Sequence, residues 1–78
     1  MFKISFHSEV VEDLKNFQEE KVKEILDKIE NKLILDPFYY PELKGNYKGL
    51  RRMKVGLFRV IFTVYKEEIT ILRVGKRK

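Results

Sequence analysis

Side chains alternate with a period of two through most of the second half of the chain. Residues 57–65 show this most clearly, because aromatic and β-branched residues recur on one face, as is typical of a half-buried strand. Residues 50–55 and 69–74 have the same character, and Gly56 and residues 66–68 supply the turns between the three segments. Three consecutive strands with short turns predict a small, mainly antiparallel sheet.

The first half of the chain changes to a helical period after a short opening strand. Residues 2–6 alternate, and apolar residues then recur at helical spacing through residues 10–33. Ser8 stands where an N-cap would begin the first helix. The polar residues 18–20 predict a bend between two helices. The second helix is expected to stop at Pro37, because the residue before a proline avoids the helical conformation.

These elements predict an α+β fold with the order β-α-α-β-β-β, in which a helical hairpin packs on the sheet. With 78 residues, the chain is expected to form a single domain over residues 1–78. It has no cysteine, which excludes a disulfide framework and a thiolate zinc site. The first residues lack the apolar run of a signal peptide, and no stretch approaches the roughly 20 apolar residues of a membrane span. We therefore expect a soluble, cytoplasmic protein with no membrane partner.

The net charge of +5 is divided unevenly between the two halves of the chain. Residues 1–40 hold six lysines and nine acidic residues, a net charge of −3, whereas residues 41–78 hold eleven Lys or Arg against three Glu, a net charge of +8. All five arginines belong to the second half. This asymmetry favours a polyanion as the ligand of the strand-rich half. The alternative is a soluble basic protein that binds no nucleic acid.

Several basic residues of the second half lie inside the predicted strands. In residues 50–55, Arg52 and Lys54 share one face, and a hairpin at Gly56 would bring Arg59 of the next strand close to them. Like charges on neighbouring strands cost roughly a few tenths of a kcal/mol or more. We therefore interpret the cluster as a site for an anionic ligand, with an ordinary solvated sheet face as the alternative.

The remaining polar residues indicate no second site. His7 is the single histidine and is interpreted as a structural surface residue. Glu9, Glu12 and Asp13 are typical of acidic residues in the first turns of a helix rather than of metal ligands. No paired carboxylates indicate a two-metal nuclease, and we expect neither a metal nor another cofactor.

Taken in order, several segments resemble the RelE/ParE toxin superfamily. The shared pattern is a leucine-glycine loop, a basic strand, a glycine turn, an aromatic-Arg-hydrophobic strand and a last strand that ends in Val-Gly-basic-Arg. The strand-helix-helix start also fits, so the resemblance covers nearly the whole chain. The segments that carry it are Leu43-Lys44-Gly45, residues 49–56, Phe58-Arg59-Val60-Ile61-Phe62 and Ile71-Leu72-Arg73-Val74-Gly75-Lys76-Arg77.

The resemblance implies a RelE-like fold and a toxin of a type II toxin–antitoxin module. RelE-type members enter the ribosomal A site and cleave messenger RNA without a metal. The RNA 2′-hydroxyl attacks the adjacent phosphate, which gives a cyclic phosphate and a free 5′-hydroxyl. The catalytic residues that the resemblance implies are Arg52, Lys54, Arg59 and Arg77. The candidates for RNA binding are Arg51, Arg73 and Lys76.

The chemistry of phosphate cleavage suits these side chains. Guanidinium groups stay protonated and stabilise the charge that develops on the non-bridging oxygens. We assign this role to Arg59 and the grip on the RNA backbone to Arg52. Lys54 is the candidate for proton transfer, and the resemblance places Arg77 near the leaving oxygen. Binding in the ribosome would contribute by ordering the RNA.

The same resemblance implies a cognate antitoxin, acidic and helical, that wraps the toxin, with the ribosome and messenger RNA as further partners. Two departures from the family pattern stand out. The tyrosine that many active members carry after the Val-Gly-basic-Arg segment has no counterpart, and Arg51 replaces a common aromatic residue. Tyr47 is expected near the basic strand, and Tyr39 and Tyr40 are expected to cover the loop. Two alternatives therefore stay open: a ParE-like inhibitor of DNA gyrase, and a degenerate member that only binds its antitoxin.

Overall fold

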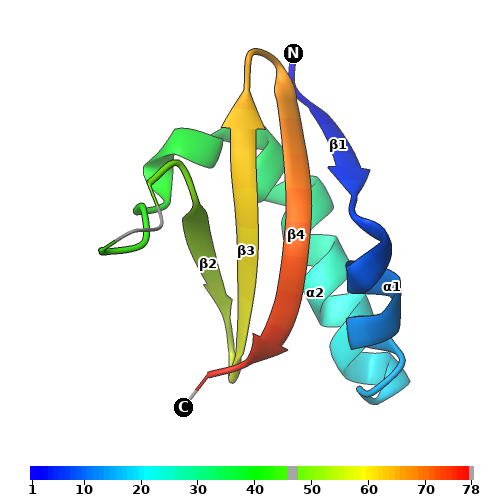
Figure 1. The fold of residues 1–78 in the computed structure, drawn as a ribbon. Coiled ribbons are helices and arrows are strands. Elements are labelled where there is room, and N and C mark those ends of the chain that lie inside the picture. Colours follow the sequence, from blue (N-terminus) through cyan, green and yellow to red (C-terminus); the bar gives the residue numbers. More distant parts are fainter. Residues whose placement is uncertain (46–47, 78) are drawn as a thin grey trace.

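The computed structural model describes residues 1–45 and 48–77, and it shows two helices packed against one four-stranded sheet (Figure 1). The order of the elements is β-α-α-β-β-β, which confirms the predicted α+β fold. Two short 3₁₀ turns, Leu33–Leu35 and Pro37–Tyr39, lie between the second helix and the second strand. The main elements are β1 (Lys3–Phe6), α1 (Ser8–Leu14), α2 (Glu19–Asn31), β2 (Arg51–Val55), β3 (Phe58–Tyr65) and β4 (Glu68–Lys76).

The sheet is mixed, with the strand order β1-β4-β3-β2. β2, β3 and β4 pair antiparallel, as predicted, whereas β1 lies parallel to β4 at one edge. The β2–β3 turn consists of Gly56 and Leu57, between the paired residues Val55 and Phe58. Gly56 has a φ of 58°, and a glycine at the first position of a two-residue turn matches a type II′ hairpin. This tight turn fixes the register between β2 and β3.

The hydrophobic core lies on one side of the sheet. α2 crosses behind the strands in Figure 1, and its Ile25 and Ile29 are fully buried. β2 and β3 contribute alternate residues to this core, and in the described chain no helix covers the opposite face (Figure 1). The buried hydrophobic residues are Val10, Ile25, Ile29, Leu33, Met53, Val55, Phe58, Val60, Phe62, Ile69, Ile71 and Val74.

β4 contains a bulge that changes which of its residues face the core. Ile61 of β3 is opposite Arg73, but the next residue of β3 is opposite Ile71, so Leu72 is an extra residue in the ladder. The bulge lets Ile71 and Val74 both point into the core although they are three positions apart. Strict alternation along β4 would have exposed one of them.

The start of the first helix differs from the prediction. His7, not Ser8, is the N-cap of α1, because the Nδ1 atom of His7 accepts a hydrogen bond from the Glu9 N–H at 3.1 Å. Ser8 is the first helical residue, so the predicted N-cap was wrong by one position. The imidazole takes the place of the hydroxyl or carboxylate that usually caps a helix, which gives His7 a structural role.

The second helix begins and ends close to the predicted positions. Gln18 is the N-cap of α2, within the bend expected at residues 18–20. α2 ends at Asn31, and the apolar spacing continues through the 3₁₀ turn that contains the buried Leu33. Pro37 begins the next turn, so the helical run does stop before the proline. Within the described ranges, neither helix has the length and apolar character that a membrane span needs.

Candidate nucleic-acid interface

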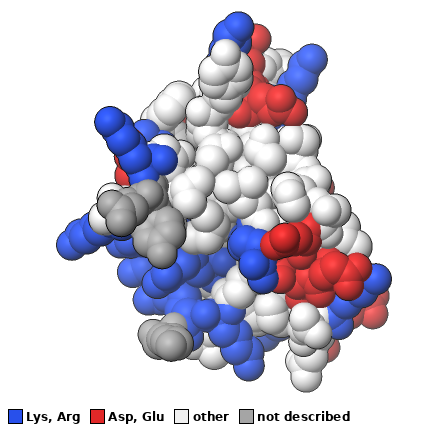
Figure 2. All heavy atoms as spheres, in the orientation of Figure 1, with Lys and Arg blue, Asp and Glu red and all other residues white. Residues whose placement is uncertain are grey.

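The uncovered side of the sheet carries the basic residues of β2 and β3. Met53 and Val55 are buried, so Arg52 and Lys54, which alternate with them, point away from the core. Arg59 lies between buried residues of β3 and points to the same side. We call Arg52, Lys54 and Arg59 the basic face. Figure 2 shows this side of the molecule, where Lys and Arg side chains gather at the lower left, over the hairpin end of β2 and β3.

Lys54 and Arg59 are directly opposite each other in the β2–β3 ladder. Val55 and Phe58 close the two-residue turn as a hydrogen-bonded pair, so the next pair, Lys54 and Arg59, is of the non-hydrogen-bonded type, in which side chains lie closer. Arg52 is roughly 7 Å further along β2. None of the three cations has an ion-pair partner among the described residues. The basic face therefore favours an anionic ligand.

A glycine leaves space beside Arg59. Gly75 of β4 is directly opposite Arg59, and a Cβ atom placed on this glycine would meet nothing within 4 Å. The Arg59 side chain thus has Lys54 on one side and open space on the other. This space gives a ligand room to approach the guanidinium from the β4 side.

Arg77 is held at the hairpin end of the sheet. Its backbone N–H donates to the Leu57 carbonyl at 2.7 Å, and its Nη1 atom donates to the Gly56 carbonyl at 3.1 Å. Both acceptors belong to the β2–β3 turn. The four cations predicted to be catalytic therefore lie on this hairpin or bound to its turn.

A pocket of about 290 Å³ borders the basic face at the edge of β2, and it is lined by Tyr40, Pro41, Arg52 and Lys54. The chain before β2 runs along this edge, since the Arg52 N–H donates to the Pro41 carbonyl at 3.1 Å. The pKa of Tyr40 is raised above its ordinary value, mainly because the side chain is partly buried. The phenol is therefore neutral at physiological pH. An aromatic ring and a proline next to two cations suit a nucleotide.

Tyr40 was not among the predicted site residues. Its ring packs edge-on against Phe62 of the core, with the ring centroids 6.2 Å apart. Glu42, two residues further along the chain, forms a β-bridge with Arg51 of β2, and no local pattern in the sequence indicates this contact. The predicted position of Tyr47 near the basic strand lies outside the described residues.

Arg51, a candidate for RNA binding, faces the core side of the sheet. It is opposite the buried Phe62. Its Nη1 atom donates to the Tyr40 carbonyl at 2.7 Å, and its Nη2 atom lies 3.6 Å from the Glu42 carboxylate. The guanidinium also lies 5.1 Å from the centre of the Phe38 ring. Arg51 therefore binds residues 38–42, the segment before β2, to this strand.

Arg73, a second candidate for RNA binding, is bound to α1. Its Nε and Nη2 atoms donate to the Asp13 carboxylate at 2.9 and 3.0 Å, and its Nη1 atom lies 3.3 Å from the Glu9 carboxylate. Asp13 also accepts the Val74 N–H at 2.9 Å. The pKa of Asp13 lies below its ordinary value, mainly because Arg73 donates hydrogen bonds to the carboxylate. Asp13 thus joins α1 to β4, a role that its place among the helix acids did not indicate.

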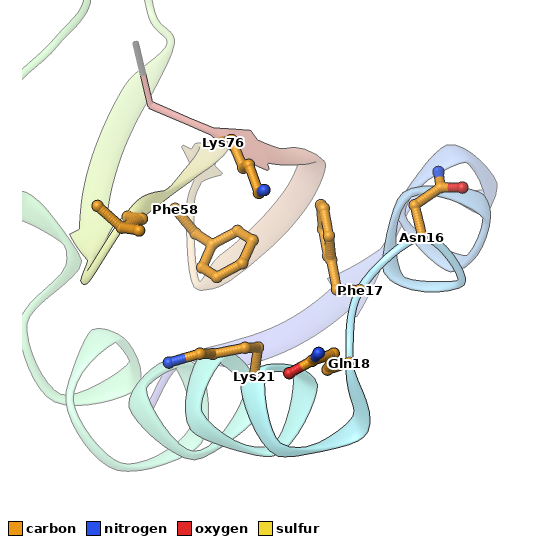
Figure 3. Close-up of a pocket in the computed structure, with 7 residues that line it drawn as sticks. Asn16, Phe17, Gln18, Lys21, Phe58 and Lys76 are labelled. Atoms are coloured by element: carbon orange, nitrogen blue, oxygen red, sulfur yellow. The ribbon is translucent and has the colours of Figure 1, made fainter.

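Lys76, the third candidate for RNA binding, lies on the helix side of the sheet (Figure 3). It is opposite the buried Phe58. It borders a second pocket, of about 380 Å³, between the β2–β3 turn and the α1–α2 connection. The structure therefore places Arg51 and Lys76 on the helix side of the sheet, away from the basic face. Arg73 lies on the uncovered side, two strands from Arg52 and opposite Ile61, but its guanidinium is bound to α1.

Solved structures with the same fold come from both branches of the superfamily. A chain of the RelBE2 toxin–antitoxin complex from Mycobacterium tuberculosis is similar with a TM-score of 0.91 and 18% identity, over 97% of this chain and 98% of that chain. The chromosomal ParDE system from P. aeruginosa gives 0.79 and 17%, over 100% and 98%. The isolated E. coli RelE toxin gives 0.76 and 18%, over 100% and 86%. At these identities the likeness establishes the fold.

A match to a protein family establishes the relationship. No curated protein sequence matches the chain. A family model described as the ParE toxin of type II toxin–antitoxin systems, parDE, matches residues 4–78. That match takes in both helices, all described cations of the hairpin and most of β1. The chain therefore belongs to the ParE toxin family of type II toxin–antitoxin systems, within the RelE/ParE superfamily that its motifs resemble.

Proposed function

We propose that this toxin cleaves messenger RNA in the ribosomal A site and that a cognate antitoxin neutralises it. The observation that carries the proposal is the basic face, whose three cations lack ion-pair partners within the described part of the chain. Like charges on neighbouring strands are unfavourable in the free protein. A phosphodiester supplies the compensating charge, and it is also the group that is cut.

The proposed reaction is an internal transesterification. The 2′-oxygen of one nucleotide forms a bond to the adjacent phosphorus, the bond from phosphorus to the 5′-oxygen breaks, and a 2′,3′-cyclic phosphate remains. Lys54 passes one of its protons to water and takes the proton of the 2′-hydroxyl in its place, and the leaving 5′-oxygen takes a proton from that water. Arg59 binds the non-bridging oxygens, where negative charge develops. Arg77, at the turn, stabilises the leaving oxygen.

Arg52 and the pocket beside it serve binding in this proposal. Arg52 lies further from the turn than Lys54 and contacts a neighbouring phosphate, which positions the RNA. Tyr40 and Pro41 line the pocket, and their rings offer a surface for a base. An open sheet face holds a flexible RNA strand poorly, so an RNA already ordered by the ribosome is the better substrate.

A cognate antitoxin is the second partner. The family is defined by toxin–antitoxin systems, and similar folds occur in the RelBE2 complex and in an E. coli RelE variant bound to a RelB peptide. The net charge of +5 favours an acidic partner. A segment that orders on binding can wrap a domain of this size.

Primer extension on a messenger RNA in a reconstituted translation mixture, with and without ribosomes, tests the nuclease. We expect cuts that appear only with ribosomes and fall within A-site codons. Lys23→Ala, which removes an exposed cation from α2, is the control and should leave the cuts unchanged. Folded protein that produces no cuts and leaves translation unaffected would reject the proposal.

Inhibition of DNA gyrase is the second candidate, because the matching family is that of ParE toxins. Such inhibition requires binding but no proton transfer, so it would survive Lys54→Met, which keeps the length of the side chain and removes its amine. A supercoiling assay with purified gyrase separates the two functions. Loss of supercoiling activity together with unaffected translation would favour gyrase as the target.

A further inference from the structure

We infer that the pocket beside Lys76 receives an apolar side chain of the antitoxin that is flanked by carboxylates. The inference rests on the proposed function only in naming the antitoxin as the occupant. We call this site the lysine-rimmed pocket. It has a volume of about 380 Å³, and Phe17, Lys21, Leu57, Phe58 and Lys76 line it together with two amide side chains.

Two aromatic rings form the apolar floor of the lysine-rimmed pocket. Phe17 comes from the α1–α2 connection and Phe58 from the first position of β3, and their ring centroids are 4.7 Å apart with the planes inclined by 62° (Figure 3). Phe58 belongs to the core and is 5% exposed, whereas Leu57 beside it is 73% exposed. An exposed leucine next to an aromatic floor is the kind of apolar surface that a partner covers.

Two lysines border this floor. Figure 3 shows Lys76 extending from the end of β4 toward the gap between the rings, and Lys21 lying on the opposite side, from α2. Lys21 has an exposed contact with Glu24 at 3.9 Å, which contributes little and can be exchanged for another carboxylate. Lys76 has no ion-pair partner among residues 1–45 and 48–77. Lysine stems extend the apolar lining while their ammonium groups attract acidic residues.

The chemistry of the lysine-rimmed pocket favours a peptide over RNA. A base would need an accessible ring face on which to stack, whereas the Phe58 ring is almost entirely buried and Phe17, which packs edge-on against it, is only partly exposed. An aliphatic side chain needs only the ring edges and the exposed Leu57. Carboxylates on either side of it would meet Lys21 and Lys76, which completes the complementarity.

The lysine-rimmed pocket and the basic face lie on opposite sides of the sheet. Phe58 points to the core, Arg59 next to it points outward, and the turn at Gly56 and Leu57 separates the two sites. A segment anchored in the pocket therefore leaves Arg59 uncovered. The same antitoxin chain can continue around the turn to the basic face, and two linked attachments hold more tightly than either one alone.

A short synthetic peptide with one leucine between glutamates is the probe, and a second peptide with glycine in place of the leucine is its comparison. Both are titrated into isotope-labelled toxin and followed by amide chemical shifts. We expect the leucine peptide to shift the signals of Phe17, Leu57 and Lys76 and to leave those of Lys54 and Arg59 in place. The glycine peptide should bind more weakly because it lacks the apolar anchor.

Two variants measure the contributions of the floor and the rim. Leu57→Ser removes an exposed contact and leaves the core intact, and it should weaken the leucine peptide about tenfold. Lys21→Glu should weaken it to a similar degree because it reverses one charge of the rim. Lys23→Glu makes the same charge change on the same helix, outside the lining of the pocket, and it should leave the Kd unchanged.

Each contrary result has a definite meaning. Shifts confined to Lys54 and Arg59, or an unchanged Kd for Leu57→Ser, would overturn the inference. Pocket signals that respond to an RNA oligonucleotide and not to the peptide would assign the pocket to RNA and would also overturn it. The titration does not depend on cleavage, so a failure of the primer-extension test leaves its result readable.

Discussion

Lys54 and Arg59 lie directly opposite each other on β2 and β3, so two positive charges occupy neighbouring positions of one hairpin. Their repulsion costs the folded protein roughly a few tenths of a kcal/mol or more. An anion bound at the basic face removes this cost. We therefore expect the pair to lower the free energy of unfolding of the free toxin slightly and to raise its affinity for a phosphate.

Replacing Arg59 separates these two effects. For Arg59→Ala we expect the single-turnover cleavage rate on ribosome-bound messenger RNA to fall about 100-fold or more, because the charge on the non-bridging oxygens loses its partner. The thermal midpoint should stay the same or rise slightly, since Arg59 is exposed and its repulsion with Lys54 is gone. Loss of folding, or a full cleavage rate, would count against the assigned role.

The open space at Gly75 predicts a steric effect on cleavage. Gly75→Leu would place a side chain beside Arg59 on the uncovered side of the sheet, and we expect cleavage to fall about tenfold or more because the phosphate is displaced. Gly75→Ala is the matched control and should lower the rate less. Gly75→Ala should fold, because nothing lies within 4 Å of an added Cβ atom. The thermal midpoint of Gly75→Leu is measured beside its cleavage rate, so that a loss of folding is recognised. A Gly75→Leu toxin with the cleavage rate of the natural chain would show that this space is not used.

The Asp13–Arg73 pair predicts how stability depends on pH. The pKa of Asp13 is lower in the folded state than in the unfolded chain. The pair therefore stabilises the fold above the unfolded pKa of about 3.9, and this contribution is lost as the pH falls through the lower, folded-state pKa. We expect the free energy of unfolding, measured in urea at several pH values, to decline below about pH 4.

Asp13→Asn should remove this part of the decline. At neutral pH we expect the variant to lose about 1 kcal/mol of unfolding free energy, because the amide accepts fewer and weaker hydrogen bonds than the carboxylate. In strong acid its stability should approach that of the natural chain. Glu30→Gln, an exposed change on α2, is the control. An equal loss at neutral and acid pH would show that the ionised carboxylate is not the cause.

The β3–β4 turn predicts a stabilising substitution. Lys66 has a φ of 55°, in the left-handed region that costs a non-glycine residue roughly 1 kcal/mol. Lys66→Gly should raise the free energy of unfolding by about 0.5 kcal/mol once the entropy of the glycine is counted. Lys66→Ala keeps the strained Cβ atom and loses only the side chain, which lies 5.5 Å from the Tyr65 ring. Equal changes in the two variants would show that backbone strain is not the cause.

The local features of this molecule could be predicted from its sequence. The period of two placed Arg52 and Lys54 opposite to the buried residues of β2, and the structure agrees. The short turn at Gly56 predicted that Arg59 would meet them, because a two-residue turn leaves little freedom of register. These contacts join residues that are close in the chain, so patterns of neighbouring residues contain them.

Contacts between distant segments could not be predicted in this way. The Arg73–Asp13 pair joins β4 to α1 across 60 positions, and the parallel pairing of β1 with β4 joins segments that are about as far apart in the chain. Arg51 was a candidate for RNA binding because of its charge. In the structure Arg51 forms a β-bridge with Glu42, and its guanidinium lies over the Phe38 ring. The bulge at Leu72 likewise depends on packing between strands. Charge and periodicity indicate the chemistry of a residue and the face on which it lies, whereas tertiary packing determines which residues it contacts.

The placement of the whole core on one side of the sheet affects how this toxin can diverge. Buried residues such as Met53, Val60 and Phe62 tolerate few substitutions, because changes of volume there cost stability. The outward-facing positions between them, such as Arg52 and Arg59, contribute little to the stability of the fold. Their side chains are constrained mainly by the ligand that binds the uncovered side. Mutations can therefore accumulate on that side while the hairpin keeps its register. The binding specificity of this fold can therefore change by successive substitutions, and every variant along the way still folds.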